Sequence, residues 1–304
     1  MSSPEWSMKQ ALFCLIGSTC LTLILAVGGF WGYRNWKMSR MTNEKFRVVA
    51  IVQTGPEKEP LKTAYLAEVL GLSADRPSHL YSLDLKQAQA KLLTSPLIES
   101  AKIKRVPPGT LLIDYTIRKP LAILSDYANT AVDSEGYLFP IAPFSSPKQL
   151  TEIYLGLPSF GSAEDTMGRS GGSWQRPLKN GYFSLALEIL RFIEDSPAKG
   201  DMRIKRIDVS HAFAPSLGQR EIVLIAEDEL IWNAQGKELV CVFPKILRLA
   251  PKDYRQQLGN FFSLRSAMHE DYKRQLASVQ EGGRFASRII DLRIPQLAFI
   301  ENRS

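Results

Sequence analysis

The chain has 304 residues, of which 45% are hydrophobic and 23% are charged. This ordinary balance excludes a mostly disordered chain, a collagen-like chain and a multi-span membrane protein. Three cysteines cannot build a disulfide scaffold, and the three histidines are too scattered for a metal-ligand cluster. Much of the formal charge of +7 flanks an apolar stretch near the N-terminus, which is typical of a membrane surface and argues against a basic nucleic-acid module.

That apolar stretch predicts one membrane span. Residues 10–33 contain no charged side chain. As a helix these residues would measure about 36 Å, enough to cross a hydrocarbon core of about 30 Å. Trp6, Trp31 and Trp36 bracket the stretch, where interfacial aromatic residues are favoured. We therefore expect a tail over residues 1–9, a transmembrane helix over 10–33 and a linker over 34–45.

A cleaved signal peptide is the alternative interpretation, because Ala26-Val27-Gly28 resembles a small-x-small cleavage site. The apolar run is longer than a usual signal core, and Lys9 is the one basic side chain before it. Both features favour an uncleaved anchor.

The distribution of basic residues around the span argues against translocation of the C-terminal body across the membrane. Four basic residues follow the span (Arg34, Lys37, Arg40 and Lys45), whereas Lys9 precedes it. The positive-inside rule would keep the large C-terminal body in the cytoplasm, although long segments translocate largely regardless of charge. The residues alone leave the orientation open.

After the linker, the pattern predicts a compact α+β module over about 75 residues. A β-branched run at 46–52 predicts a strand, and a helix capped by Thr63 ends near Gly71. Asp84 can cap a second helix that ends before Pro96. Alternating residues at 101–104 and 111–117 predict two further strands in a hairpin. The order is strand, helix, helix, strand, strand.

Beyond Pro120 the pattern is mostly β. A helical stripe runs from Phe183 to Ile193, and a long amphipathic stripe over 254–279 predicts a helix packed on the sheet. The Gly/Ser-rich segment 161–181 lacks the spacing of a phosphate-binding loop and is predicted as an ordinary loop. Strands are expected at 121–124, 131–132, 137–139, 204–209, 222–225, 230–232, 239–243, 286–294 and 296–300.

The residues favour binding over catalysis. No His-Glu-x-x-His or paired-cysteine motif occurs. The acidic pairs Asp133/Glu135 and Glu227/Glu229 are predicted to be solvated turn residues, and His79 is predicted to be exposed in a loop. We therefore expect no enzyme activity, no cofactor, no metal and no small-molecule substrate.

Several motifs together resemble the FtsQ/DivIB cell-division proteins. They are PLIESAKIKR at 96–105 followed by PGTL at 108–111, RKPLA at 118–122, VDSEGYLF at 132–139, and IDLR at 290–293. This chain departs from the family at Ile117, where glutamate is usual, and at Val106-Pro107, where tryptophan precedes the proline. The loop 161–181 and the helix 254–279 look like insertions. The resemblance implies a POTRA-like domain over 46–119 and a mostly antiparallel β-rich domain over 120–304.

The resemblance also implies a function. Such proteins are single-pass proteins of the cell inner membrane at the division septum, with a cytoplasmic N-terminus and a periplasmic body. They are scaffolds that bind FtsB and FtsL and help to control septal peptidoglycan synthesis. The partner-binding strand maps here to Ile294, Leu297, Ala298, Phe299 and Ile300. From strand alternation we expect Leu297 and Phe299 to face inward and the others outward.

Two other functional classes are alternatives to a division scaffold. POTRA modules also occur in envelope proteins that act in outer-membrane protein assembly or secretion, but such proteins repeat the module or precede a β-barrel, and this sequence shows neither feature. A membrane-anchored hydrolase with unrecognised residues is the second alternative.

Overall fold

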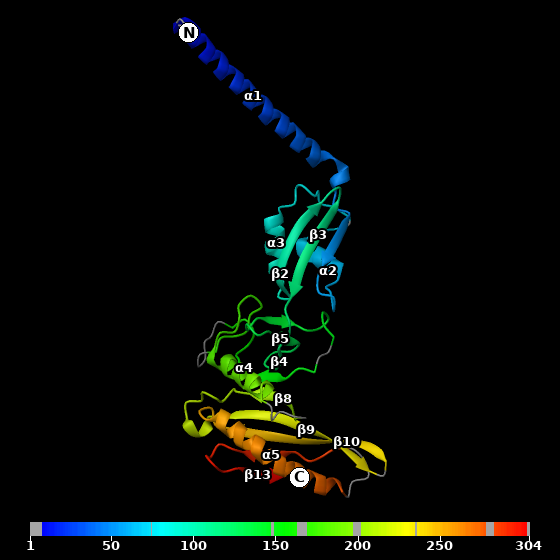
Figure 1. The fold of residues 1–304 in the computed structure, drawn as a ribbon, viewed down its shortest axis with the longest axis vertical. Coiled ribbons are helices and arrows are strands. Elements are labelled where there is room, and N and C mark those ends of the chain that lie inside the picture. Colours follow the sequence, from blue (N-terminus) through cyan, green and yellow to red (C-terminus); the bar gives the residue numbers. More distant parts are fainter. Residues whose placement is uncertain are drawn as a thin grey trace, which may run out of the picture. The chain divides into compact units, whose positions relative to one another are not determined.

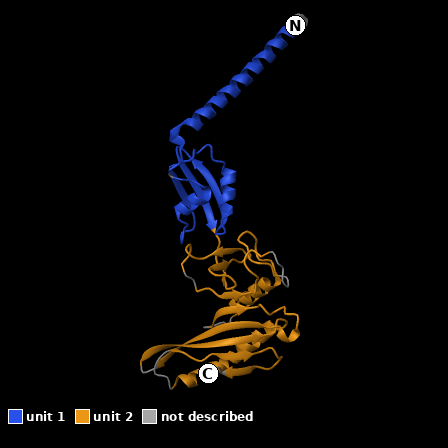
Figure 2. Cartoon of the chain, turned by 180° about the vertical axis from the view of Figure 1, so that it is seen from behind, with its two compact units in different colours: residues 1–116 blue, residues 117–304 orange. Residues whose placement is uncertain are grey.

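The computed structural model forms two compact units, residues 1–116 and 117–304 (Figure 2). The residues that the structure describes are 8–73, 75–146, 149–162, 169–196, 202–234, 236–277 and 283–302.

The first unit begins with one long helix, α1 (Met8–Thr42), of 35 residues. Its segment Leu12–Thr42 is long and apolar enough to cross a membrane. The helix extends well past Tyr33 and takes up most of the predicted linker, because no Gly or Pro interrupts residues 34–42. A short 3-10 turn, η1 (Glu44–Phe46), follows. Residues 1–7 of the predicted tail lie outside the described residues.

The predicted strand-helix-helix-strand-strand order is confirmed. Its elements are β1 (Ala50–Thr54), α2 (Thr63–Leu70), α3 (Leu85–Leu93), β2 (Ile98–Val106) and β3 (Thr110–Ile117). The sheet order is β1-β3-β2, with β1 parallel to β3 (Figure 1). The first strand begins four residues later than predicted, because Phe46 ends the η1 turn instead of starting the strand.

The helix ends test the predicted caps. The Asp84 side chain accepts a hydrogen bond from the backbone N–H of Lys86 at 2.9 Å, as the sequence predicts. Gly71 closes α2 with a φ of 69°, a left-handed conformation that suits glycine. The prediction for Thr63 is wrong: Thr63 is the first residue of α2, and Lys62 occupies the cap without a side-chain hydrogen bond.

Burial shows which face of this sheet is covered. Leu111, Ile113 and Tyr115 of β3 are almost fully buried, whereas Asp114 is exposed. The covering residues come from α2 and α3 and include Leu66, Leu70, Ala88 and Leu92. The two helices therefore cover one face of the sheet and leave the other face open, because strand side chains alternate between faces.

The second unit is built on one mixed sheet. Its strands are β4 (Ala122–Leu124), β5 (Thr130–Val132), β6 (Leu138–Pro140), β7 (Glu152–Tyr154), β8 (Met202–Asp208), β9 (Ile222–Ala234), β10 (Lys237–Leu249), β11 (Gly283–Arg284), β12 (Arg288–Asp291) and β13 (Phe299–Asn302). Their order is β13-β12-β10-β9-β8-β7-β4-β5-β6, with β11 beside β10. Among the described strands, five pairs are antiparallel, including the long β9–β10 pair. The other four pairs, β4–β7, β7–β8, β10–β11 and β10–β12, are parallel.

Two long helices share the core of this unit. The predicted stripes of α4 (Gly181–Glu194) and α5 (Tyr254–Leu276) are buried, and both helices belong to one hydrophobic cluster with the sheet. Figure 1 shows α5 lying along β9 and β10. The Tyr254 hydroxyl of α5 donates a hydrogen bond to Glu188 of α4 at 3.1 Å, which joins the two helices. A short turn, η3 (Leu217–Gln219), precedes β9.

The turn predicted near Glu227 and Glu229 is absent. Both residues lie within β9, which runs without a break and pairs with all of β10. Glu227 is buried and forms ion pairs with Lys205 at 3.1 Å and Arg284 at 2.7 Å. Acidic residues disfavour strands, but these two cations satisfy the buried carboxylate and allow the strand to continue. Glu229 is exposed, as predicted.

The turn predicted at 133–136 is confirmed, but Asp133 is not solvated. It is 7% exposed and accepts hydrogen bonds from the backbone N–H groups of Glu135 and Tyr137. Arg118 donates to the same carboxylate at 2.8 Å and stacks over the ring of Tyr137. Two of the motifs that carry the family resemblance therefore hold each other in place.

The prediction that His79 is exposed is wrong, because His79 is partly buried and forms a β-bridge with Arg47. In the loop 161–181, Gly171 donates its N–H to the Ser162 carbonyl, and residues 163–168 lie outside the described part of the chain. The predicted helix over 254–279 ends at Leu276, and residues 278–279 also lie outside the described part.

Candidate partner-binding edge

The last strand lies at the edge of the second unit's sheet. β13 pairs antiparallel with β12 and stands at the end of the strand order. Its first two residues, Phe299 and Ile300, are 55% and 47% exposed. Because neighbouring strand residues point to opposite faces, this edge presents apolar side chains on both faces of the sheet.

The predicted inward orientation of Leu297 and Phe299 is wrong, since both are 55% exposed. The expected alternation of side chains between the two faces of the strand does not apply to Leu297, because Leu297 precedes β13. Its N–H donates to the carbonyl of Ile294 at 3.2 Å, and the intervening Gln296 has a left-handed φ of 63°. A tight turn therefore separates β12 from β13, and the side chains before Phe299 follow the turn instead of a strand.

This turn and α5 enclose a groove of about 380 Å³. Ile294, Leu297 and Ala298 form part of its wall, so the structure brings three of the five predicted site residues to the groove and the other two to the adjoining strand. All five are exposed. The complete lining is Asp253, Gln256, Gln257, Asn260, Leu264, Leu292, Ile294, Pro295, Gln296, Leu297 and Ala298.

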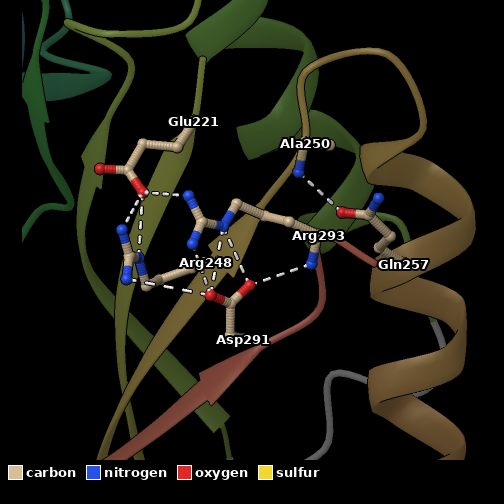
Figure 3. A network of polar contacts seen from close by, with 6 residues as sticks. All are labelled: Glu221, Arg248, Ala250, Gln257, Asp291 and Arg293. Carbon is tan, nitrogen blue, oxygen red and sulfur yellow. Dashed lines mark hydrogen bonds and ion pairs between the residues drawn. The ribbon is translucent and has the colours of Figure 1, made fainter. Parts of the chain in front are cut away.

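A network of charged side chains fixes the bend that leads into this turn (Figure 3). Arg293 donates to both carboxylate oxygens of Asp291, at 2.7 Å from Nη2 and 3.0 Å from Nε, and also to Glu221 at 3.3 Å. Arg248 of β10 donates to the same Glu221 oxygen at 2.6 Å and 2.9 Å. Beside the network, Gln257 of α5 accepts the backbone N–H of Ala250 at 2.8 Å. The network ties the end of β12 to β10 and to the start of β9.

The network stabilises the ionised form of Asp291. Burial alone would raise the pKa of its carboxyl group, but the hydrogen bonds and positive charge of Arg293, together with the charge of Arg248, lower that pKa below its usual value. The same contact with Asp291 raises the pKa of Arg293. The pair is therefore charged throughout the physiological pH range.

A second set of charges holds α5 against the sheet. Asp228 of β9 and Lys245 of β10 are fully buried and form an ion pair. From α5, Arg265 donates to Asp228 at 3.1 Å, and His269 lies 3.2 Å from the same carboxylate. Burial alone would raise the pKa of Asp228, but Lys245 and Arg265 lower it. This buried cluster fixes the helix that forms one wall of the groove.

Sequence reasoning missed most of these supporting residues. Glu221, Arg248 and Gln257 lie far apart in the chain, and no local pattern marks them. The Asp291-Leu292-Arg293 motif was found, but its role in shaping the bend requires the partners that folding brings to it. Among the described residues, no group of three or more histidines, cysteines or acidic residues is arranged to hold a metal ion.

Two comparisons with known proteins found similarities. Residues 57–115 match the family model of the POTRA domain, FtsQ-type. The chain is also 28% identical over 109 residues to the cell division protein FtsQ of Geobacter sp. (strain M21). That match spans 36% of this chain and 39% of the relative, so the chain covers well under two thirds of the relative's length.

The module from α2 to β3 therefore matches an FtsQ-type POTRA domain, and among the described residues the preceding helix α1 is a candidate transmembrane helix. The candidate edge at Ile294–Ile300 lies outside the POTRA match.

Proposed function

We propose that this protein is a membrane-anchored scaffold of cell division. In this proposal it is a non-catalytic protein that binds other division membrane proteins of the FtsB/FtsL type and helps to control septal peptidoglycan synthesis. Its N-terminus is cytoplasmic, its body is periplasmic, and it is located at the division septum. The similarity to a cell division protein supports the general role.

One observation carries the partner-binding part of the proposal: β13 is an edge strand that exposes Phe299 and Ile300 on its two faces. Natural edge strands are usually protected by charges, prolines or a covering element. An exposed apolar edge instead suits a partner strand, because backbone hydrogen bonds supply affinity and the alternating side chains supply selectivity.

The groove extends this surface. A partner segment paired along β13 would pass Phe299 and reach Ala298 and Leu297 at the groove wall. Apolar partner side chains inserted there would be removed from water, at about 25 cal/mol per Å² of buried surface. The edge and the groove together therefore form one continuous binding surface.

The first experiment compares Phe299→Asp with Ile231→Asp in the full chain. Both residues are exposed apolar strand residues, at 55% and 71%, but Ile231 lies in β9 instead of β13. We expect Phe299→Asp to weaken binding of an FtsB-like partner at least about ten-fold, as for an interface hot spot, and Ile231→Asp to leave it unchanged. If binding survives Phe299→Asp and Ala298→Asp but is lost with Ile231→Asp, the proposed site is wrong.

Proline substitutions test the strand-addition mode. Backbone N–H groups alternate along a strand, so of Ile300 and Glu301 one donates toward β12 and the other toward the free edge. Proline removes the N–H. We expect one of Ile300→Pro and Glu301→Pro to abolish partner binding while the domain stays folded. Loss of binding in neither variant would rule out strand addition.

Orientation and localisation need separate tests. In intact spheroplasts, external protease should digest residues 46–304, and in inside-out vesicles those residues should be protected. A fluorescent fusion should gather at midcell in dividing cells. Protection in spheroplasts would place the body in the cytoplasm, and a diffuse envelope signal would contradict the division role.

A further inference from the structure

The helix α1 is longer than the membrane it would cross. Its 35 residues correspond to about 52 Å, against a hydrocarbon core of about 30 Å. The uncharged segment 10–33 accounts for the span itself. The remaining residues, Arg34 to Thr42, continue the same helix for about 13 Å beyond it.

This extension concentrates positive charge on one side. Arg34, Lys37 and Arg40 are spaced three residues apart, so at 100° per residue they lie within an arc of about 120°. No acidic residue occurs anywhere in Met8–Thr42. The next acidic residue, Glu44, forms an ion pair with Arg47 at 2.8 Å. Among the described residues, no carboxylate forms an ion pair with any of the three helix cations.

Aromatic residues place these cations at the depth of lipid headgroups. Trp31 and Tyr33 end the uncharged segment, and Trp36 stands among the cations. Tryptophan and tyrosine favour the membrane–water interface. The guanidinium of Arg40 lies 3.8 Å from the centre of the Trp36 ring, so this cation is held beside an interfacial anchor.

We propose that Arg34, Lys37 and Arg40 form a headgroup-binding collar for acidic phospholipids of the bilayer that α1 crosses. Arginine can bind phosphate oxygens through two parallel hydrogen bonds, and lysine contributes a point charge. Basic residues next to a membrane span are attracted to anionic lipid surfaces. The collar would also account for basic residues that follow the span, whichever way the chain is oriented.

The test uses the full chain reconstituted in phosphatidylcholine bilayers that contain trace spin-labelled phosphatidylglycerol or spin-labelled phosphatidylcholine. Electron spin resonance reports the fraction of each label that is motionally restricted by the protein. One cation near an anionic surface corresponds to about a five-fold change in equilibrium constant. We expect the wild-type protein to prefer phosphatidylglycerol about five-fold or more, and the triple variant R34Q/K37Q/R40Q to show no preference.

The matched control is K58Q/K86Q/K91Q, which removes the same charge from three exposed lysines outside α1. It should keep the wild-type preference, and R34K/R40K should keep most of it. If R34Q/K37Q/R40Q and the single variant Arg40→Gln both keep the wild-type preference for phosphatidylglycerol, the proposal is wrong. It is also wrong if K58Q/K86Q/K91Q loses as much of this preference as R34Q/K37Q/R40Q does.

Salt separates a lipid surface from a site for soluble phosphate. The preference should fall sharply at 1 M sodium chloride, where the Debye length is about 3 Å. Sodium phosphate and sodium chloride of equal ionic strength should reduce it equally. A much stronger effect of phosphate would show a soluble-anion site and contradict the proposal. None of these measurements depends on partner binding at β13, so the collar and the proposed function can fail separately.

Discussion

Two regions of the second unit reverse the usual distribution of residue types. Beneath α5, the core contains the buried charges of Asp228, Lys245 and Arg265. At the C-terminal edge, by contrast, Phe299 and Ile300 leave apolar surface in contact with water. The two regions lie on either side of the same groove. The helix α5 forms one wall of the groove, and the turn before β13 forms the other.

The difference shows that one region makes the unit rigid and the other is available for recognition of a partner. Buried ion pairs contribute little net stability, but breaking one is costly because it leaves an uncompensated charge. The cluster under α5 therefore fixes the position of the helix. The exposed edge contributes little to the fold, and its apolar surface is available to a partner. Substitutions in the first region should change stability, and substitutions in the second should change binding.

The largest expected effect follows from Lys245→Met. This change leaves Asp228 buried without the lysine, and we expect the opening free energy of β9 and β10 to fall by about 3–5 kcal/mol. Amide hydrogen exchange measures this unit separately from the POTRA domain. Lys252→Met, at an exposed position just before α5, should change the value by less than about 0.5 kcal/mol. Equal effects of the two variants would show that the buried pair does not hold this region together.

The sequence predicted the POTRA domain well because its signals are local. Alternation placed Leu111, Ile113 and Tyr115 on the buried face, and Asp84 and Gly71 marked helix ends. Each of these signals depends on residues within a few positions of one another. The amphipathic stripe of α5 was predicted for the same reason.

The prediction for the second unit was less accurate where the local structure depends on contacts with residues that are distant in the sequence. Glu227 looked like a turn residue, because nothing nearby in the chain shows that Lys205 and Arg284 would satisfy it in a strand. The candidate site residues were predicted from the family resemblance, whereas their orientation was predicted from strand alternation and is wrong for Leu297 and Phe299. The left-handed Gln296 breaks the alternation before Phe299. Pro295 marks a turn there, but no glycine at position 296 signals the left-handed conformation.

A smaller effect is expected from Arg293→Gln, which tests whether the fixed bend supports the edge. The variant loses the paired hydrogen bonds to Asp291 and the contact with Glu221. Protection of β12 and β13 amides from hydrogen exchange should fall by about 1–2 kcal/mol, while β4 to β6 should be unchanged. Arg293→Lys should recover only part of this loss, because lysine cannot form the forked pair. Full protection in Arg293→Gln would show that the bend does not need the network.

A still smaller effect should appear with pH. Because the pKa of Asp291 is lowered in the folded protein, its contribution is complete above the unfolded value of about 3.9 and is lost as pH falls through the lower folded value. Protection of β12 and β13, corrected for intrinsic exchange rates, should therefore be level from pH 7 to about 5 and decline below about 4. Asp291→Asn should remove this part of the decline. An identical acid profile in Asp291→Asn would assign the decline to other carboxylates, such as Asp228.

The smallest expected effect on stability is that of Phe299→Ala, which we compare with the same substitution at the buried Phe261. Phe261 of α5 is fully buried, and Phe261→Ala should cost about 3–5 kcal/mol, because it removes apolar contacts and leaves a cavity. Phe299→Ala should cost less than about 0.5 kcal/mol, since more than half of that side chain is already in water. Partner binding should respond in the opposite order, with Phe299→Ala weakening it at least about five-fold. A large loss of stability in Phe299→Ala would mean that this side chain supports the fold, and the distinction between a rigid core and an open edge would then fail.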